Sequence, residues 1–169
     1  IQLSSAICEM AERLCDEPRF VENVVYEINF SSPEALRVAS YVCGRSGGKT
    51  ARALLDYAVQ QIVLEPYYSL FFCADVHAFS DHTIDVFCEK ARHPFIDAKS
   101  QATFLCVLRR LGARVLAKLI DVYEAIWKQA QGNSTEISEL ARKVLIACAG
   151  GVDCGPSPEA WRALLSART

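Results

Sequence analysis

The sequence predicts an all-α fold, with about seven to nine helices packed as antiparallel helical hairpins in an α-solenoid-like arrangement. Apolar residues recur with a 3.6-residue period in nearly every segment, and no stretch alternates or carries a hairpin turn. Proline, serine and glycine separate these segments. The length of 169 residues suits one domain, so we expect a single helical domain over residues 1–169.

The first half of the chain gives four helix starts in order. Residues 3–16 form the first amphipathic segment, and Pro18 can open a second helix. The run 31–34, Ser-Ser-Pro-Glu, is a strong start because a hydroxyl cap precedes proline and an acid. From Thr50 a wide apolar stripe predicts a fourth helix.

The second half continues the pattern after Pro66. Gly112 marks a break or a small contact, and Gly150-Gly151 stop a helix. The predicted helical segments here are 80–92, 95–111, 113–131, 135–149 and a last helix that starts at 156–159.

Charge and cysteine content narrow the class of protein. The net charge is −2, which gives the whole chain no reason to bind nucleic acid or anionic lipid. Residues 1–85 carry 12 acids and 6 bases, whereas residues 86–169 carry 8 and 12, an asymmetry that can direct docking. Without a CxxC or zinc spacing, the eight cysteines predict free thiols in a reducing compartment: Cys8, Cys15, Cys43, Cys73, Cys88, Cys106, Cys148 and Cys154.

The stretch 41–58, YVCGRSGGKTARALLDYA, superficially resembles a phosphate-binding loop. That loop requires glycine five residues before Gly48, where this chain has Cys43; Gly44 lies one residue too close. The preceding segment is helical rather than a strand. We therefore predict a helix connector, in which Gly44 takes a left-handed position and Ser46 or a later glycine starts the next helix.

A second stretch, 73–93, is rich in His, Cys, Asp and Glu. Cys73 and His77 are four residues apart, as are Asp85 and Glu89, so each pair could share a helix face and ligate a metal. A connector near Ser80 need not bring the pairs together. Capping residues and solvated charges are the preferred interpretation, and no metal or cofactor is predicted.

Two groups are candidates for binding a partner. Arg110, Arg114 and Lys118 are spaced by four and form a basic stripe if one helix carries them, for RNA phosphates or an acidic protein. A solvated face is the alternative. The second group is an aromatic cluster that packs in the core or marks an interface: Tyr67, Tyr68, Phe71 and Phe72.

The segments 33–55 and 138–165 share a layout: an acid-led helix, a cysteine, Gly-Gly, and a helix with Arg-Ala-Leu-Leu. Residues 145–167 resemble the helical hairpins of tetratricopeptide and pentatricopeptide proteins, although the regular repeat spacing is missing. The whole chain also resembles the MIX family, which are mitochondrial membrane-anchored proteins of kinetoplastid parasites. The features behind this resemblance are the helical, cysteine-bearing sequence, the lack of a catalytic motif and the start at Ile1.

The MIX resemblance implies a scaffold related in layout to tetratricopeptide, HEAT-type and 14-3-3 proteins. It further implies self-association, an N-terminal inner-membrane anchor outside this chain, association with the cytochrome c oxidase complex, and a role in mitochondrial segregation. The family offers no catalytic residues.

We therefore expect a non-enzymatic helical scaffold that binds proteins, as a homodimer, at the mitochondrial inner membrane. The apolar content of 51% and the absence of a coherent active site favour this function. The alternative is an RNA-binding helical-hairpin protein.

Overall fold

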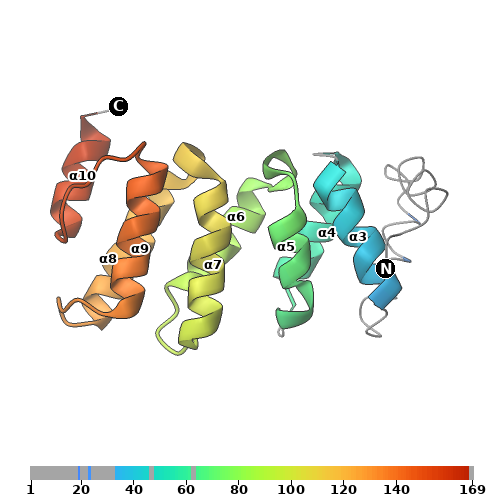
Figure 1. Ribbon diagram of the computed structural model, residues 1–169, viewed down its shortest axis with the longest axis horizontal. Coiled ribbons are helices and arrows are strands. Elements are labelled where there is room, and N and C mark those ends of the chain that lie inside the picture. The colour runs from blue at the N-terminus through green and yellow to red at the C-terminus, as the bar shows by residue number, and fades with distance from the viewer. Residues whose placement is uncertain (1–18, 20–22, 24–32, 46–47, 62–63, 168–169) are drawn as a thin grey trace. The chain divides into compact units, whose positions relative to one another are not determined.

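The computed structural model describes residues 19, 23, 33–45, 48–61 and 64–167. These residues form eight α-helices and three short 3-10 helices, and no strand occurs among them (Figure 1). The predicted all-α fold class is confirmed. The helix predicted over 3–16 and the one opened by Pro18 lie outside the described residues, apart from the helical Arg19 and Asn23. Within the described part, every helix is too short or too polar to cross a membrane.

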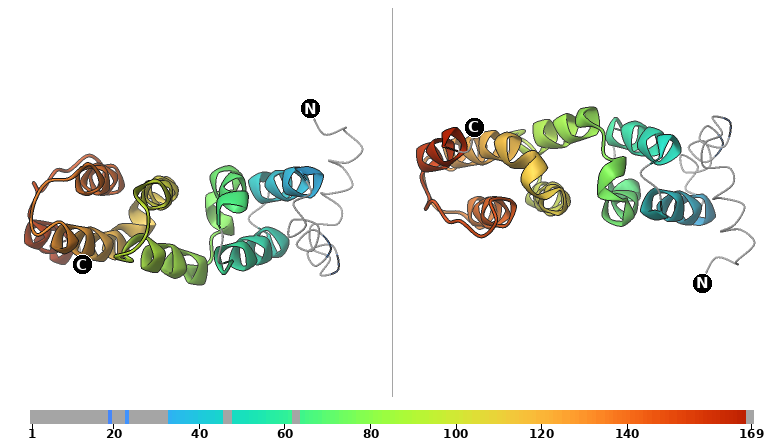
Figure 2. Two further views of the ribbon diagram at one scale, coloured as in Figure 1. Left: turned by 90° about the horizontal axis from the view of Figure 1, so that it is seen from below. Right: turned by 90° about the horizontal axis from the view of Figure 1, so that it is seen from above.

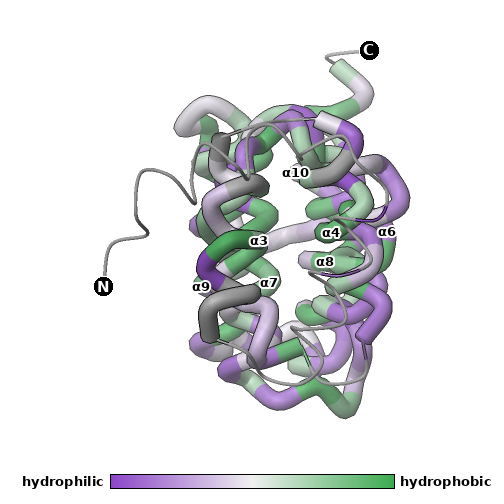
Figure 3. Tube along the Cα trace, turned by 90° about the vertical axis from the view of Figure 1, so that its right-hand side faces the viewer, coloured by the Kyte–Doolittle hydropathy of each residue, from purple (hydrophilic) through white to green (hydrophobic). Residues whose placement is uncertain are grey.

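The chain divides into two compact units, residues 1–83 and 84–169, and the boundary falls inside α6 (Asp81–Ala91). Hydrophobic and hydrophilic residues share the same helices, as amphipathic packing requires (Figure 3). The expectations of one domain and of solenoid-like stacking stay predictions.

In the first unit, α3 packs against both α4 and α5 (Figure 2). The stripe predicted from Thr50 faces the core, because Leu54, Leu55, Ala58 and Val59 of α4 are buried. The elements are α3 (Pro33–Arg45), α4 (Lys49–Val59), η1 (Glu65–Tyr67), α5 (Tyr68–Cys73) and η2 (Val76–Ala78).

Gly44 is a helical residue, and this corrects the left-handed position predicted for it. It lies inside the last turn of α3, where a Cβ atom would sit 2.9 Å from the backbone oxygen of Cys73. Beside it, the amide of Asp75 donates to the carbonyl of Cys43 at 2.6 Å. Glycine is therefore used here for the close approach of two backbones rather than for a turn.

The sequence offers Ser80 or Asp81 as the cap of this helix, and the structure shows that the Ser80 hydroxyl holds the start of α6. The Ser80 hydroxyl accepts from the amide of Thr83 at 3.0 Å. Both the Ser80 and Thr83 hydroxyls donate to the Asp56 carboxylate of α4. Because Thr83 is fully buried, this carboxylate satisfies a hydroxyl that would otherwise be costly to bury.

In the second unit, α9 packs against α7 and α8, and α8 also carries α10. Thr135 and Ser138 form a reciprocal capping box at the start of α9, with N–H to Oγ distances of 2.7 and 3.1 Å. The elements after α6 are α7 (Ala98–Arg110), η3 (Gly112–Val115), α8 (Leu116–Gln129), α9 (Glu136–Cys148) and α10 (Pro158–Ser166).

Aromatic residues fill the core of this unit. The rings of Phe87 and Phe104 meet edge to face, with centroids 5.4 Å apart. Trp161 and Tyr123 are also buried, and each uses its polar atom to hold the loop before α10. These rings therefore serve packing within the unit.

Candidate interaction surface

The stretch 41–58, which superficially resembles a phosphate-binding loop, contains the end of α3, a short connector and most of α4. Helix α3 runs through Arg45, and Gly48 is the extended N-cap residue of α4. Lys49 is the first residue of α4, one residue before the predicted start at Thr50. Helix α3 thus precedes the glycines, whereas a phosphate-binding loop follows a strand.

Several His and Asp side chains of 73–93 have separate local partners. Asp75 caps η2 by accepting from the amide of His77 at 2.8 Å. The Asp85 carboxylate pairs with Lys118, and His82 Nε2 lies 3.3 Å from the side-chain nitrogen of Gln60. Among the described residues, no three His, Cys, Asp or Glu side chains gather where they could hold a metal ion.

Burial also sets the chemistry of the thiols. It raises the pKa of Cys43 to about 12 and that of Cys88 to about 11, and it raises the pKa of Cys148 as well. A thiol with such a pKa is almost entirely protonated at neutral pH and is a poor nucleophile. These three cysteines therefore act as small apolar residues.

The predicted aromatic candidates differ in exposure. Tyr67 and Phe71 are buried, which fits the core-packing alternative for these two rings. Tyr67 ends η1 and Phe71 lies in α5, and both rings belong to the core. Tyr68 is half-buried, and Phe72 is 43% exposed.

The basic stripe predicted for Arg110, Arg114 and Lys118 does not lie on one helix. Arg110 ends α7, Arg114 belongs to η3, and Lys118 lies in α8. Gly112 has φ of +60°, which interrupts the helix between Arg110 and Lys118. Lys118 is also paired with Asp85. The three basic residues therefore do not share one helix, and the RNA-binding alternative stays a prediction.

The most exposed aromatic residue that the structure describes is Phe95, at 90%. It lies in the 92–97 turn, defined as the residues that connect α6 to α7. The sequence-based prediction began a helix at residue 95 and gave Phe95 to its apolar face. The helix begins three residues later, after its N-cap Asp97, and the phenyl ring faces water.

Backbone hydrogen bonds fold the 92–97 turn tightly. The His93 amide donates to the carbonyl of Lys90 and the Ile96 amide to that of His93, each at 3.2 Å. The His93 ring accepts from the Phe95 amide through Nδ1 at 3.3 Å, and the His93 and Phe95 rings lie 5.8 Å apart. The turn that carries the exposed phenyl ring therefore has a defined backbone conformation.

Two glutamine side chains tie the turn to the rest of the unit. Gln101, which is buried, donates to the carbonyl of Ala91 at 2.7 Å, and Gln129 of α8 donates to that of Arg92 at 2.7 Å. Asp97 closes the turn by accepting from the Ser100 amide at 2.8 Å. The signal that sequence reasoning missed is this Asp-x-x-Ser cap, which places Phe95 before the helix.

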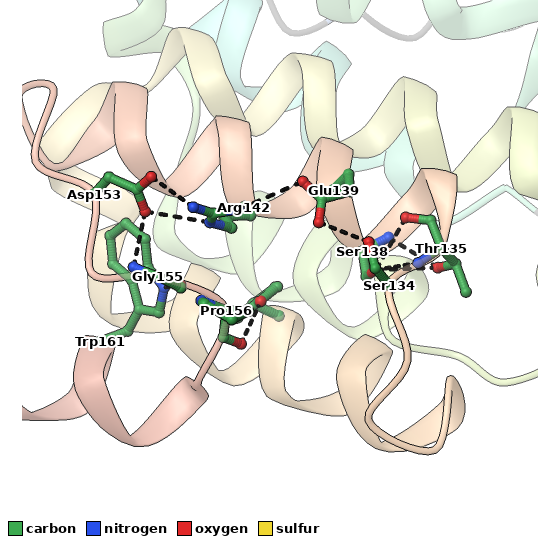
Figure 4. Close-up of polar contacts among 10 residues, drawn as sticks. Ser134, Thr135, Ser138, Glu139, Arg142, Asp153, Gly155, Pro156 and Trp161 are labelled. Atoms are coloured by element: carbon green, nitrogen blue, oxygen red, sulfur yellow. Dashed lines mark hydrogen bonds and ion pairs between the residues drawn. The ribbon is translucent and has the colours of Figure 1, made fainter.

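The connector between α9 and α10 is held by a separate polar cluster (Figure 4). Arg142 binds Asp153 through two nitrogens, at 3.2 and 2.6 Å, and Asp153 accepts from the Gly155 amide at 2.8 Å. Trp161 Nε1 donates to the carbonyl of Gly155 at 2.9 Å, and the Tyr123 hydroxyl donates to that of Pro156 at 2.7 Å. These contacts hold the connector in place and occupy polar atoms of all four side chains in hydrogen bonds within the chain.

Comparison with known proteins gives one informative match. No family model matches the chain, and no solved structure matches it. The chain is 28% identical over 150 residues to a bifunctional enzyme Fae/Hps of Methanosarcina barkeri (strain Fusaro / DSM 804). The match covers 84% of this chain, which spans only 35% of the relative's length.

This match contradicts the prediction that the chain is not an enzyme, because the relative is a bifunctional enzyme. On this comparison that prediction is wrong. The resemblance to the MIX family and the mitochondrial setting it implies stay predictions.

Proposed function

We propose that the chain is a helical scaffold that binds other proteins, and that the 92–97 turn is its main contact surface. The observation that carries the proposal is the 90% exposure of Phe95. Removing a phenyl ring from water contributes about 1.5–3 kcal/mol, so leaving it exposed on the free chain forgoes that stabilisation. Phenylalanine is among the residue types enriched in protein–protein interfaces, so an exposed ring on an ordered turn can serve as a contact.

The rigidity of the turn supports this function. Binding loses less conformational entropy when the anchor residue is already ordered. The hydrogen bonds from Gln101 and Gln129 order the carbonyls at the start of the turn, and Asp97 orders its end. Phe95 is thus presented as a preformed anchor, and the exposed Arg92 beside it can form polar contacts at the rim.

The test compares the chain with Phe95→Asp in affinity purification from the native extract, with quantification by mass spectrometry. Val152→Asp is the matched control, because Val152 is a 40% exposed apolar residue in the same unit. We expect at least one protein to fall by about tenfold or more with Phe95→Asp alone, as a lost aromatic anchor requires. Equal recovery with both variants would remove the proposal.

Cellular location follows from the MIX resemblance and is proposed with the scaffold function. The chain would act at the mitochondrial inner membrane, beside the cytochrome c oxidase complex, and support mitochondrial segregation. Expression of the tagged full-length protein, followed by organelle fractionation, tests the location. Recovery outside mitochondria would contradict it.

Catalysis is the second candidate, favoured by the match to the bifunctional enzyme. The scaffold and an enzyme are compatible, because a helical module can form part of an enzyme or bind one. The purified chain should be assayed for both activities of that relative, with the relative as the positive control. If the purified chain shows neither activity at concentrations at which the relative is active, catalysis is excluded as its function.

A further inference from the structure

We propose that Cys43 and Cys73 form a peroxide-responsive thiol pair in the first unit, in which oxidation of Cys73 leads to a disulfide bond with Cys43. The inference goes beyond the scaffold function and assigns a modification site. It rests on the contact between the backbones that carry the two residues, on the difference in burial of the two thiols, and on the electrostatic influence of one thiol on the other.

The ends of α3 and α5 bring the two cysteines together. Cys43 lies in the last turn of α3, and Cys73 is the last residue of α5. The carbonyl of Cys43 accepts from the Asp75 amide at 2.6 Å, and the carbonyl oxygen of Cys73 would lie 2.9 Å from a Cβ atom on Gly44. A disulfide requires Cα atoms less than about 7 Å apart, so only segments in close contact can form one. The contact between these two helix ends supplies that proximity.

The Cys73 thiol also acts on Cys43 electrostatically. Burial, and in addition the negative charge of an ionised Cys73, raise the pKa of Cys43 to about 12. Such an influence requires that the two sulfur atoms lie near each other, because the interaction of charges weakens with distance. In the reduced chain the Cys43 thiol donates to the carbonyl of Ala51, with a distance of 3.8 Å between sulfur and oxygen. Disulfide formation therefore requires the Cys43 side chain to leave Ala51 and turn toward Cys73.

The difference in burial determines which thiol reacts first. Cys73 is exposed, so a peroxide in solution can reach it, whereas Cys43 is fully buried. Redox-sensitive cysteines are accessible to solvent and often lie next to a second cysteine that resolves the oxidised sulfur as a disulfide. Cys73 therefore takes the role of the peroxide-reactive thiol, and Cys43 takes that of the resolving thiol.

The reaction balances with hydrogen peroxide as the oxidant. The Cys73 thiolate attacks one peroxide oxygen, the O–O bond breaks, and a sulfenic acid forms while the released hydroxide takes up the thiol proton as water. The Cys43 sulfur then attacks the Cys73 sulfur. The S–S bond forms, the S–O bond breaks, and the hydroxyl group leaves as a second water with the proton of the Cys43 thiol. The two thiols lose two electrons together, and these reduce the peroxide to water.

Proximity offsets the weak nucleophilicity of the Cys43 thiol. A thiol attacks as its thiolate, and a group with a pKa of about 12 forms little thiolate at neutral pH. Two reacting groups that are held side by side, however, have an effective concentration far above that of any thiol in solution. We therefore expect Cys43 to capture the sulfenic acid of Cys73 before other thiols do, within minutes to hours.

Peptide mapping without reduction tests for the pair. The folded, fully reduced chain is treated with hydrogen peroxide, blocked with iodoacetamide and digested with trypsin, which leaves Cys43 in peptide 38–45 and Cys73 in peptide 53–90. We expect these two peptides to be linked by a disulfide, in at least about tenfold excess over any other linked pair. Because Cys88 shares the second peptide, fragmentation in the mass spectrometer must place the bond at Cys73.

Three variants distinguish a pair from a single reactive thiol. In Cys73→Ser, oxidation of Cys43 should fall by at least about tenfold, because the buried thiol no longer has an oxidised neighbour to attack. In Cys43→Ala, the sulfenic acid of Cys73 is not resolved, so a 1,3-dione trap should label Cys73 at least about fivefold more than in the parent. Cys88→Ala is the matched control, since it removes a buried thiol from the same tryptic peptide. Circular dichroism melts check that each variant is folded.

The outcomes decide the inference in either direction. A disulfide between Cys43 and Cys73 in the parent and in Cys88→Ala, together with increased dione labelling of Cys73 in Cys43→Ala, supports it. The inference is overturned if Cys73 stays reduced, if it is oxidised while Cys43 remains a thiol, or if it pairs mainly with another cysteine. Equal dione labelling of Cys73 in the parent and in Cys43→Ala also overturns it, because Cys43 would then not resolve the sulfenic acid.

Discussion

The α3–α4 and α9–α10 connectors contain similar glycine-rich sequences but use glycine for different physical reasons. At the first connector, Gly44 is helical and lets the backbone of Cys73 come within 2.9 Å of where a Cβ would lie. At the second, Gly150 and Gly151 have φ of +76° and +89°, and a Cβ would meet nothing within 4 Å. Lack of space excludes a side chain at Gly44, whereas the left-handed backbone conformation disfavours one at Gly150 and Gly151.

The two connectors also differ in what holds them. Backbone groups meet at the first, where the amide of Asp75 donates to the carbonyl of Cys43. Side chains from three helices hold the second, with Trp161 at its centre. The first junction therefore depends on close approach, and the second on a buried anchor.

The largest effect is expected from removing that anchor. Trp161→Ala deletes a fully buried indole and the hydrogen bond to Gly155, and should cost about 3–5 kcal/mol of unfolding free energy. Trp161→Phe keeps most of the packing and should cost clearly less. Urea unfolding followed by circular dichroism measures both. Equal losses for the two variants would show that the hydrogen bond, and not packing, dominates.

Because lack of space limits Gly44 and backbone conformation limits Gly150, Ala and Asn substitutions should rank in opposite orders of destabilisation at the two positions. Asparagine tolerates the left-handed region better than alanine but is larger. At Gly150, Ala should therefore cost about 1–2 kcal/mol and Asn less. At Gly44, Ala should cost about 1–3 kcal/mol and Asn more, because the obstacle is a backbone oxygen that no side-chain rotation can move.

Chemical unfolding of the four single variants at one pH measures this inversion. Each connector serves as the control for the other, since the same two residues are introduced at both. If Ala and Asn ranked in the same order at both glycines, the two positions would share one cause and the distinction drawn between them would be wrong.

The polar cluster of the second connector should respond to acid. The Gly155 amide and Arg142 lower the pKa of Asp153 below its usual value of 3.8. A lowered folded-state pKa means that the stabilisation is complete above the unfolded value and is lost as pH falls through the folded one. Part of the acid sensitivity below about pH 4 should therefore disappear in Asp153→Asn.

Urea midpoints at pH 7 and at about pH 3 measure this effect. Glu136→Gln removes an exposed carboxylate from the first turn of α9 and is the matched control. A pH dependence of Asp153→Asn that equals that of the parent would show that this carboxylate does not contribute through its charge.

The sequence predicts elements better than it predicts which residues are exposed. The all-α class, the Ser80 cap, the break at Gly112 and the stop at Gly150-Gly151 follow from local signals, and the structure confirms them. The role of Gly44 depends on Cys73, 29 residues away, so no local pattern contains it. Phe95 was misplaced because its apolar character fits a helix face as well as a turn.

The smallest effect is expected at Gly48, the N-cap residue of α4. Its φ is −68°, which any residue adopts, and it makes no side-chain cap hydrogen bond. Gly48→Asp should therefore stabilise the chain by a few tenths to about 0.5 kcal/mol, because a carboxylate can accept an orphan amide and favours the helix N-terminus. Gly48→Ala supplies no acceptor and should not stabilise. A thermal melt at low salt resolves the difference, and a gain from Ala equal to that from Asp would mean that backbone restriction, rather than capping, limits this end of the helix.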